Sequence, residues 1–182
     1  MIFPGIGYGI DRPLLYYTGK IAQECGYRVI NTRYSGISKE CLKDPGRMPE
    51  AFELAVKQTE EQLREADLAS YEDVLFISKS IGTVAAGIYA DRYDIPARQV
   101  FYTPFAQSFT PAVEGNGIVF FGDRDPWVIP EEIRNHCIAK KMDYTVIEGG
   151  NHSLETGHVH TDVENIRTII YKTEDFIASM TV

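Results

Sequence analysis

The sequence is poor in cysteine, and its few cysteines form no recognisable pattern. Only three occur in 182 residues, Cys25, Cys41 and Cys137, and no CxxC pair is present. The odd number and the wide spacing argue against a disulfide framework and against a thiolate zinc site. We therefore expect free thiols in a reducing compartment.

Basic runs and long apolar runs are also missing. Lysine and arginine number 18 against 26 aspartate and glutamate, which gives a net charge of −8. An acidic chain without a basic run is a poor ligand for nucleic-acid phosphates and for anionic membrane surfaces. No stretch approaches the ~18 apolar residues of a spanning helix, and the first residues lack the basic and apolar regions of a signal peptide. We expect a cytoplasmic protein that binds neither nucleic acid nor membrane.

Length and composition fit a single domain that covers residues 1–182. Hydrophobic residues make up 44% of the chain and charged residues 24%, as in ordinary globular domains. A chain of this size buries about 70% of the surface that its unfolded form exposes, so its core needs neither disulfides nor metal. No linker, repeat or low-complexity segment divides the chain.

Short apolar runs alternate with helical patterns along the whole chain. Most runs are apolar on both faces, which is typical of strands buried in a parallel sheet. The stretches between them carry apolar residues three and four positions apart, which predicts helices. We expect strands near residues 2–3, 27–31, 73–77, 99–102, 117–121 and 144–147, and helices near 12–25, 49–66, 82–93, 130–141 and 162–180. The alternation predicts an α/β three-layer sandwich, in which a mostly parallel central sheet of about six strands has helices on both faces.

The third apolar run leads into a serine between small residues. Ser78-Lys79-Ser80-Ile81-Gly82 follows this run, and a helical pattern starts directly behind it. A small-x-Ser-x-small turn between a strand and a helix is typical of a nucleophile elbow, because the turn is tight and the serine backbone is strained. The new helix behind the serine favours an oxyanion. By itself the motif also fits a second interpretation, in which Ser80 is only a helix N-cap.

Two later strand ends supply an acid and a histidine. Gly122-Asp123-Arg124-Asp125 follows the fifth apolar run, and Gly150-Asn151-His152 follows the sixth. Ligand sites of open parallel sheets lie beyond the carboxyl ends of the strands, so these residues are expected near Ser80. A serine needs a base to become a nucleophile, and a histidine serves as that base when a carboxylate fixes its tautomer. The chain order Ser, Asp, His is that of one hydrolase architecture.

With these motifs the sequence resembles the α/β-hydrolase superfamily, in particular its small, lidless, dienelactone-hydrolase-like members. The resemblance covers nearly the whole chain. It rests on residues 3–7, which resemble the family's H-G-x loop with Pro4 in place of histidine, on 78–82 as the elbow with Ser78 in place of the first glycine, on 122–128 as the G-x-x-D-x-x-V acid loop, and on 150–153 as the G-x-H loop. The family's first two strands and its cap are missing from the pattern, so the resemblance implies a minimal α/β-hydrolase fold.

The resemblance implies a serine hydrolase of the carboxylesterase or thioesterase type. Ser80 is the expected nucleophile, His152 the general base and Asp125 the acid that orients it, with Asp123 as the alternative acid. Such an enzyme cleaves an ester, thioester or amide bond of a small molecule through an acyl-enzyme. The alternative is a catalytically inactive hydrolase-fold binding module. Neither a cofactor nor a metal is implied, and a homodimer is compatible with the sequence.

The resemblance also implies an oxyanion hole and a substrate pocket. The expected donors are the backbone N–H groups of Ile81 and Ile6, with Gly7 next. Four residues that follow strand ends are candidates for the pocket, although each of them also fits ordinary packing at the rim of the sheet. These residues are Gly7, Tyr8, Phe105 and Trp127.

Three other features carry less weight for function. The glycines of residues 5–9 lack the final glycine of a dinucleotide fingerprint, which disfavours a flavodoxin-like or nucleotide-binding domain. Lys79 lies inside the elbow motif, which allows an effect on the neighbouring charge, but we expect it to be solvated or ion-paired. His158 and His160, with Asp162 nearby, are expected to be surface residues instead of metal ligands.

Overall fold

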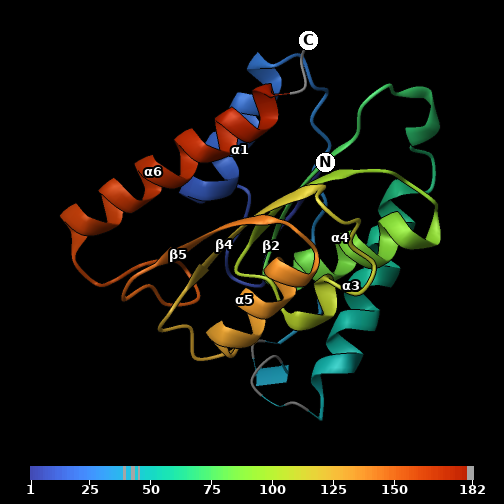
Figure 1. The fold of residues 1–182 in the computed structure, drawn as a ribbon. Helices are drawn as coiled ribbons and strands as arrows, with labels where there is room; N and C mark the ends of the chain where they lie inside the picture. Colours follow the sequence, from blue (N-terminus) through green and yellow to red (C-terminus); the bar gives the residue numbers. More distant parts are fainter. Residues whose placement is uncertain (39, 42–43, 45, 180–182) are drawn as a thin grey trace.

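A parallel sheet between two layers of helices forms the centre of the molecule (Figure 1). The computed structural model describes residues 1–38, 40–41, 44 and 46–179. Its five-stranded sheet has the order β1-β2-β3-β4-β5, and every neighbouring pair is parallel. The strands are β1 (Ile2–Phe3), β2 (Leu75–Lys79), β3 (Arg98–Tyr102), β4 (Gly117–Gly122) and β5 (Asp143–Ile147).

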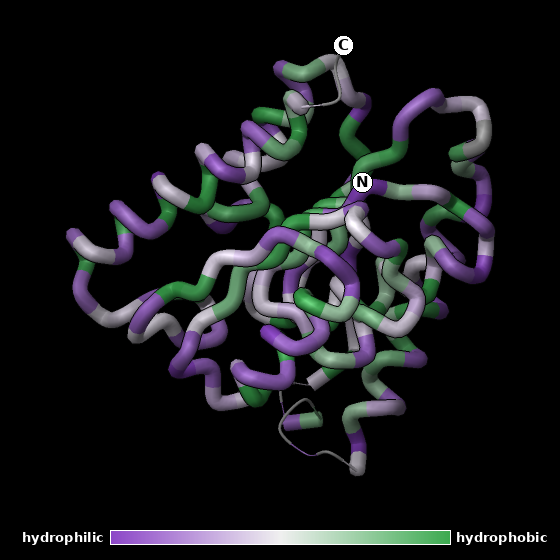
Figure 2. Tube along the Cα trace, in the orientation of Figure 1, coloured by the Kyte–Doolittle hydropathy of each residue, from purple (hydrophilic) through white to green (hydrophobic). Residues whose placement is uncertain are grey.

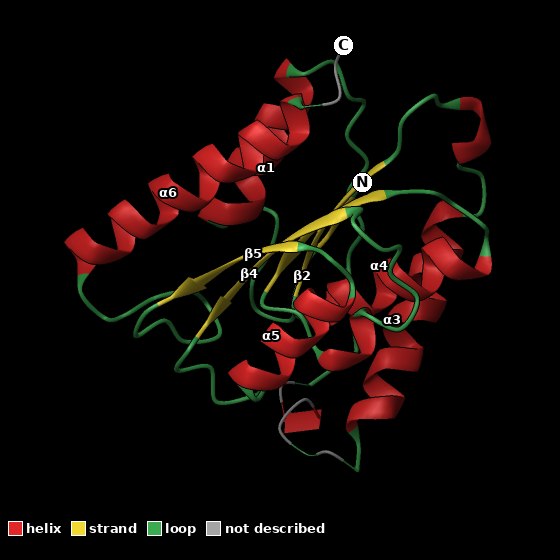
Figure 3. Ribbon diagram, viewed as in Figure 1, coloured by secondary structure: helices red, strands yellow, loops and turns green. Residues whose placement is uncertain are grey.

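The helices divide between the two faces of the sheet (Figure 3). One face carries α1 (Pro13–Glu24) and α6 (Val159–Ala178), which pack against each other. The other face carries α3 (Met48–Leu63), α4 (Ile81–Arg92) and α5 (Pro130–Ala139), and two short 3-10 helices occupy Leu68–Ser70 and Ala106–Ser108. The predicted α/β sandwich is confirmed. The predicted end of the last helix, at residue 180, lies outside the described residues.

Alternate strand residues face the two helical layers, which explains the doubly apolar runs. Ile77 and Phe120 pack into a cluster with residues of α1 and α6. Their chain neighbours Phe76 and Phe121 pack on the opposite face. In Figure 2 much of the central sheet is hydrophobic, with polar residues at the strand ends, whereas the outer helices alternate between the two colours. A strand buried on both sides needs apolar residues at every position, as expected in parallel sheets.

The predicted strand at residues 27–31 is the main difference between expectation and structure. This segment makes a single parallel bridge, between Asn31 and Ile2. The bridge consists of a hydrogen bond from the Ile2 N–H to the Ile30 carbonyl, at 2.8 Å, and one from the Thr32 N–H to the Ile2 carbonyl, at 2.9 Å. Because β1 contains only two residues, its outer edge offers the backbone groups of Ile2 alone. The sheet of the described residues therefore has five strands where about six were expected, because residues 27–31 add a single bridge instead of a strand.

The path of the chain reverses at β1. After β1 it runs through α1 to Asn31 on the outer side of that strand, and then returns through α3 to β2 on the inner side. Open α/β sheets bind ligands where the strand order reverses in this way, beyond the carboxyl ends of the two strands. Ser80 follows β2 directly, and Gly5 follows β1. The topology therefore points to the neighbourhood of these two residues as the functional site.

None of the described helices combines the length and the apolar character that crossing a membrane requires. The cysteines Cys25, Cys41 and Cys137 are free, which confirms the prediction of unpaired thiols. Cys137 is buried in α5, and this burial raises the pKa of its thiol to about 12. It therefore packs as a small apolar side chain.

The start of α4 touches the backbone at the end of β1. A Cβ atom added at Gly82 would lie 2.3 Å from the Phe3 carbonyl oxygen and 2.6 Å from that of Pro4. These atoms belong to the backbone of a buried strand end, so they cannot move aside as a flexible side chain would. Only glycine allows the helix to begin this close to the sheet.

We expect Gly82→Ala to destabilise the fold by about 3 kcal/mol or more, because the added methyl group forces the first turn of α4 away from β1. Urea unfolding followed by circular dichroism measures the change. Gly46→Ala is the control, since among the described residues its added Cβ would meet the Asp44 carboxylate alone, at 3.3 Å. Equal stability of the Gly82 variant and wild type would contradict the contact described above.

Candidate active site

Ser80 occupies a strained turn between β2 and α4. Its backbone angles are φ 56° and ψ −125°, a region that side-chain-bearing residues rarely adopt. The strand before it lies two residues later than predicted, so Ser78 and Lys79 belong to β2 and pair with β3. Ser78 stands where this elbow usually has glycine, and its buried hydroxyl donates to the Val100 carbonyl at 3.0 Å. The elbow thus accepts a serine at this position without an unsatisfied polar group.

The contacts around Ser80 hold its strained backbone in place. Its N–H donates to the Tyr102 carbonyl at 3.0 Å. Its carbonyl accepts the hydroxyl of Thr83 at 2.5 Å, and Thr83 also shares a hydrogen bond with Ser108 at 2.6 Å. Strained residues persist only where the surrounding structure over-determines them. The side chain of Ser80 is therefore presented in one orientation.

His152 links Ser80 to a buried carboxylate. Its Nε2 lies 2.8 Å from the Ser80 hydroxyl oxygen, and its Nδ1 lies 2.6 Å from Asp125 Oδ2. A carboxylate only accepts hydrogen bonds, so Nδ1 carries the proton and Nε2 accepts the Ser80 hydroxyl. The second Asp125 oxygen accepts the N–H of Trp127 at 2.9 Å. The structure thus brings together the three residues that the strand ends suggested.

Asp123, the alternative acid, has a different partner. It is exposed, and its carboxylate accepts the Gly149 N–H at 2.7 Å. The Asp125 side chain, in contrast, is fully buried against the imidazole. Of the two aspartates, the structure places Asp125 beside His152.

The acid loop (residues 122–128) and the His loop (residues 150–155) support each other. A Cβ added at Gly122 would lie 2.0 Å from the Gly150 carbonyl oxygen, so the two loops touch through their backbones. Within the His loop, the Asn151 side chain accepts the N–H groups of Ser153 and Glu155, at 2.7 and 3.2 Å. These bonds close a tight turn around the histidine, so His152 is held by its loop as well as by Asp125.

The β1 loop (residues 4–8) lies against the elbow. A Cβ added at Gly5 would lie only 3.2 Å from Ser80 Cβ. The loop turns through a hydrogen bond from the Gly5 N–H to the Tyr8 carbonyl, at 3.1 Å, and through Gly7, which is exposed with φ 80°. Ile6 is half-buried on this turn. Ile81 is the first residue of α4, so its N–H has no partner within the helix.

Two of the expected pocket residues flank the histidine. The ring of Trp127 lies 4.2 Å from the His152 ring, centroid to centroid, and that of Phe105 lies 5.8 Å away. Trp127 is half-buried, whereas Phe105 is 2% exposed and packs against Phe52 at 5.3 Å. Trp127 therefore presents an apolar surface beside the imidazole, and Phe105 is mostly part of the core. The Tyr8 hydroxyl accepts the first-turn N–H of Leu14 in α1 at 3.3 Å, and its ring centroid lies 5.0 Å from the Lys79 ammonium group.

Lys79 is neither solvated nor ion-paired, contrary to expectation. It is 1% exposed, and no carboxylate of the described residues forms a salt bridge with it. Its ammonium group donates to the Thr103 hydroxyl and to the His152 carbonyl, the latter at 2.6 Å. A signal for this burial was present in the sequence, because Lys79 lies two positions after Ile77 on the same face of a buried strand.

Burial and two nearby charges of opposite sign set the protonation of His152. Burial, assisted by the positive charge of Lys79, lowers the pKa of His152 to about 4, and Asp125 opposes this shift. Burial also lowers the pKa of Lys79 to about 7. The imidazole is therefore neutral at physiological pH, which is the form that can accept a proton.

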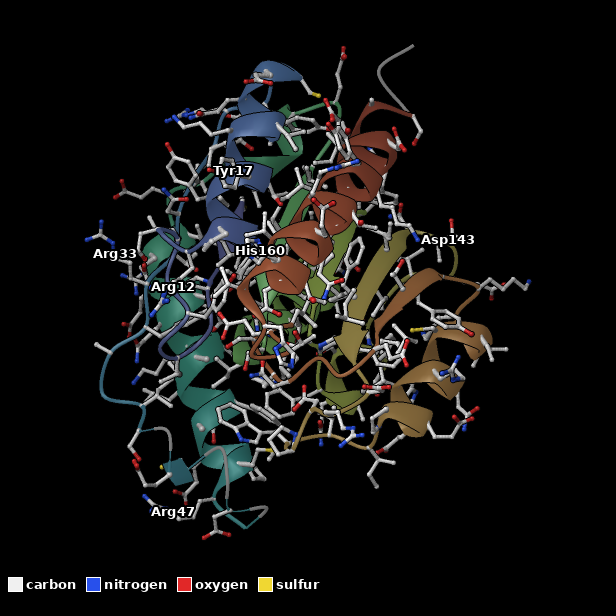
Figure 4. All side chains as sticks on the ribbon, turned by 90° about the vertical axis from the view of Figure 1, so that its left-hand side faces the viewer. Arg12, Tyr17, Arg33, Arg47, Asp143 and His160 are labelled. Carbon is white, nitrogen blue, oxygen red and sulfur yellow. The ribbon has the colours of Figure 1, made fainter. Side chains whose placement is uncertain are left out.

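The histidines near the start of α6 lie apart from this arrangement. His158 and His160 are exposed, and His160 lies on the outer surface of α6 (Figure 4). The Asp162 carboxylate accepts the N–H and the hydroxyl of Thr156, at 2.6 and 2.7 Å, and these bonds lower its pKa. Among the described residues, no group of three potential ligands is placed to hold a metal ion.

A cavity of about 730 Å³ lies at the opposite edge of the sheet, around the amino ends of β1 and β2. Tyr27 and Asp73, which are hydrogen-bonded to each other, are among the residues that line it. The described lining residues include no histidine, so this cavity lacks the kind of base found beside Ser80.

Comparisons with known proteins agree with the architecture. No protein-family model matches the chain, and no curated protein sequence is significantly similar to it. Solved structures do match. A protein from Xanthomonas campestris pv. campestris, classed with the alpha/beta hydrolase superfamily, has a TM-score of 0.68 at 11% identity, covering 98% of this chain and 97% of its own.

Two further solved structures match at similar identity. An esterase from Pyrococcus furiosus has a TM-score of 0.64 at 12% identity, covering 98% of this chain and 81% of its own. A lidless alpha/beta serine hydrolase from Xanthomonas campestris has a TM-score of 0.57 at 11% identity, covering 98% and 79%. Sequence identities this low establish a shared fold and nothing about function. The chain has the α/β-hydrolase fold.

Proposed function

We propose that the protein is a serine hydrolase that cleaves an ester, thioester or amide bond of a small molecule. The observation that carries the proposal is the hydrogen-bonded series from Ser80 through His152 to Asp125, built on a strained elbow at the carboxyl end of β2. Each member meets a chemical requirement: a presented hydroxyl, a neutral base within reach, and a buried acid that holds the base in one tautomer.

The first half of the reaction forms an acyl-enzyme. The Ser80 oxygen attacks the substrate carbonyl carbon while its proton passes to His152 Nε2, and Asp125 stabilises the resulting imidazolium. The carbonyl oxygen becomes an oxyanion, which the N–H groups of Ile81 and Ile6 bind. The N–H of Ile81 points from the start of α4, where the helix dipole favours negative charge. The intermediate then collapses, and the leaving group takes the proton from His152.

The second half releases the acid and restores the enzyme. A water molecule gives a proton to His152 Nε2 and attacks the acyl carbon, so a second oxyanion forms at the same donors. Collapse of this intermediate breaks the bond to Ser80, whose oxygen recovers its proton from the imidazolium. No cofactor takes part in this scheme.

The surroundings of the histidine support an esterase or thioesterase over other hydrolases. Trp127 offers an apolar ring 4.2 Å from the imidazole ring, where the substrate would lie. An apolar contact suits an acyl chain or an aromatic leaving group. The match to an esterase and to a lidless serine hydrolase supports the same assignment.

We expect Ser80→Ala to lower kcat on p-nitrophenyl acetate by about 10⁴-fold or more, because no other nucleophile replaces the hydroxyl. A fluorophosphonate probe should label wild type and leave the variant unlabelled. Ser70→Ala is the matched control, since Ser70 is exposed and donates only to the Asp67 carbonyl. Undiminished turnover by the Ser80 variant would rule out the proposal, and an unlabelled wild type would favour a binding module without catalysis.

The two aspartates can be separated by amide substitution. We expect Asp125→Asn to lower kcat by about 10⁴-fold, because an amide cannot stabilise the imidazolium and favours the wrong tautomer. Asp123→Asn should stay within about fivefold of wild type, because its amide oxygen still accepts the Gly149 N–H. Steady-state kinetics on one ester measures both. The reverse ranking would assign the acid role to Asp123.

The pH dependence should reflect the buried histidine. Because the pKa of His152 is lowered to about 4, its base form persists down to that pH, and kcat/KM should fall only below it. A histidine with an ordinary pKa near 6.5 would lose about tenfold in kcat/KM between neutral pH and a pH of about 5.5. Initial rates across this range, with circular dichroism to check folding, measure the acid limb. An acid limb of kcat/KM with its midpoint near pH 6.5 would show that His152 is solvated.

A further inference from the structure

Lys79 joins separate segments of the candidate site to the elbow. Its ammonium group donates to the Thr103 hydroxyl at the end of β3 and to the His152 carbonyl in the His loop. It also lies 5.0 Å from the centroid of the Tyr8 ring in the β1 loop, within the range of a cation–π contact. Because Lys79 directly precedes Ser80, these contacts tie the His loop and the β1 loop to the candidate nucleophile.

The partner of Lys79 on β3 has a strained backbone. Thr103 is fully buried with φ 45°, which is rare for a β-branched residue. Its N–H donates to the Phe120 carbonyl at 2.7 Å, and its hydroxyl accepts the ammonium group of Lys79. Strain of this kind persists where several contacts enforce it. The ammonium group of Lys79 therefore has two acceptors held in place by the fold, the Thr103 hydroxyl and the His152 carbonyl.

We propose that Lys79 is a positioning residue of the candidate active site, whose ammonium group fixes the backbone of His152 and keeps the imidazole in line with the Ser80 hydroxyl. The inference rests on the proposed function, since it gives Lys79 a role in positioning His152 relative to Ser80. Lys79 acts through His152 and takes no proton from the substrate.

The charge itself is costly at this position. Lys79 is 1% exposed and has no ion-pair partner among the described residues, so its ammonium group loses most of its hydration there. A methionine has nearly the same length and would fill the space without this loss. Packing alone would therefore favour a neutral side chain. The two hydrogen bonds to the site are what the ammonium group adds.

The charge also reaches the imidazole through space. The titratable groups that face the ammonium group are Asp125 from the acid loop, Glu155 and His152 from the His loop, and Tyr8 from the β1 loop. The two carboxylates favour the charged amine, and the charged amine in turn disfavours the imidazolium. Where it is charged, Lys79 therefore adds to the effect of burial in favouring the base form of the histidine.

The variants Lys79→Met and Lys79→Arg separate the effect of the positive charge from the effect of side-chain packing. Methionine removes the ammonium group, whereas arginine keeps a positive charge in a larger side chain. Trp127 is the only tryptophan of the chain and its ring lies 4.2 Å from that of His152, so its fluorescence reports protonation of the imidazole without any substrate. A His152→Ala variant identifies the step in this titration that belongs to His152. Thermal unfolding confirms that each variant is folded.

We expect Lys79→Met to raise the midpoint of the His152 titration by about one pH unit and to lower kcat/KM on a p-nitrophenyl ester by about 10- to 100-fold. Lys79→Arg should keep the midpoint close to that of wild type and lose less activity than the methionine variant. Lys172→Met is the control, because Lys172 is exposed and donates to a threonine hydroxyl, Thr145, away from the site. It should change neither quantity.

Two results would overturn the inference. One is a folded Lys79→Met protein with the midpoint and kcat/KM of wild type. The other is an equal loss of activity in both Lys79 variants with an unmoved midpoint, which would assign Lys79 to packing alone. Failure of the proposed function looks different: wild type then hydrolyses no ester, while the fluorescence midpoint still reports the effect of Lys79 on His152.

Discussion

The arrangement around Ser80 depends on the contact between the first turn of α4 and the end of β1. Gly82 lets the helix start against the carbonyl groups of Phe3 and Pro4, two residues behind the strained turn at Ser80. The same contact brings the β1 loop to within 3.2 Å of the serine, measured from the Cβ that Gly5 lacks. One close approach of two backbones therefore positions both Ser80, the proposed nucleophile, and the β1 loop, which carries the proposed second oxyanion donor.

The candidate site could largely be predicted from the sequence because parallel strands share one direction. Each apolar run ends at the same edge of the sheet, so polar residues directly behind the runs meet there whatever their separation along the chain. Ser80 and His152 are 72 positions apart, yet their reacting atoms lie 2.8 Å from each other. The choice between Asp123 and Asp125 was harder, because both follow the same strand and only the loop backbone decides which carboxylate turns inward.

What the sequence did not reveal depends on neighbours that are distant along the chain. Residues 27–31 have the apolar and β-branched character of a strand, but a strand forms only where a partner offers enough backbone groups, and β1 offers those of Ile2 alone. Likewise, lysine is rarely buried, so a rule based on residue type places Lys79 in water. Its acceptors, Thr103 and the His152 carbonyl, come from two other segments and appear only when the chain is folded.

Two opposite charges lie near the imidazole of His152, and they act on its neutral and its protonated form in opposite ways. Asp125 favours the imidazolium and Lys79 disfavours it. Burial strengthens both effects, since little water remains to screen them. In the proposed reaction, the resting histidine is neutral and able to accept a proton, and Asp125 limits the cost of the imidazolium that the Ser80 proton would form. Because the pKa of Lys79 is lowered to about 7 and that of His152 to about 4, the lysine already carries its charge over the pH range in which the histidine takes up a proton.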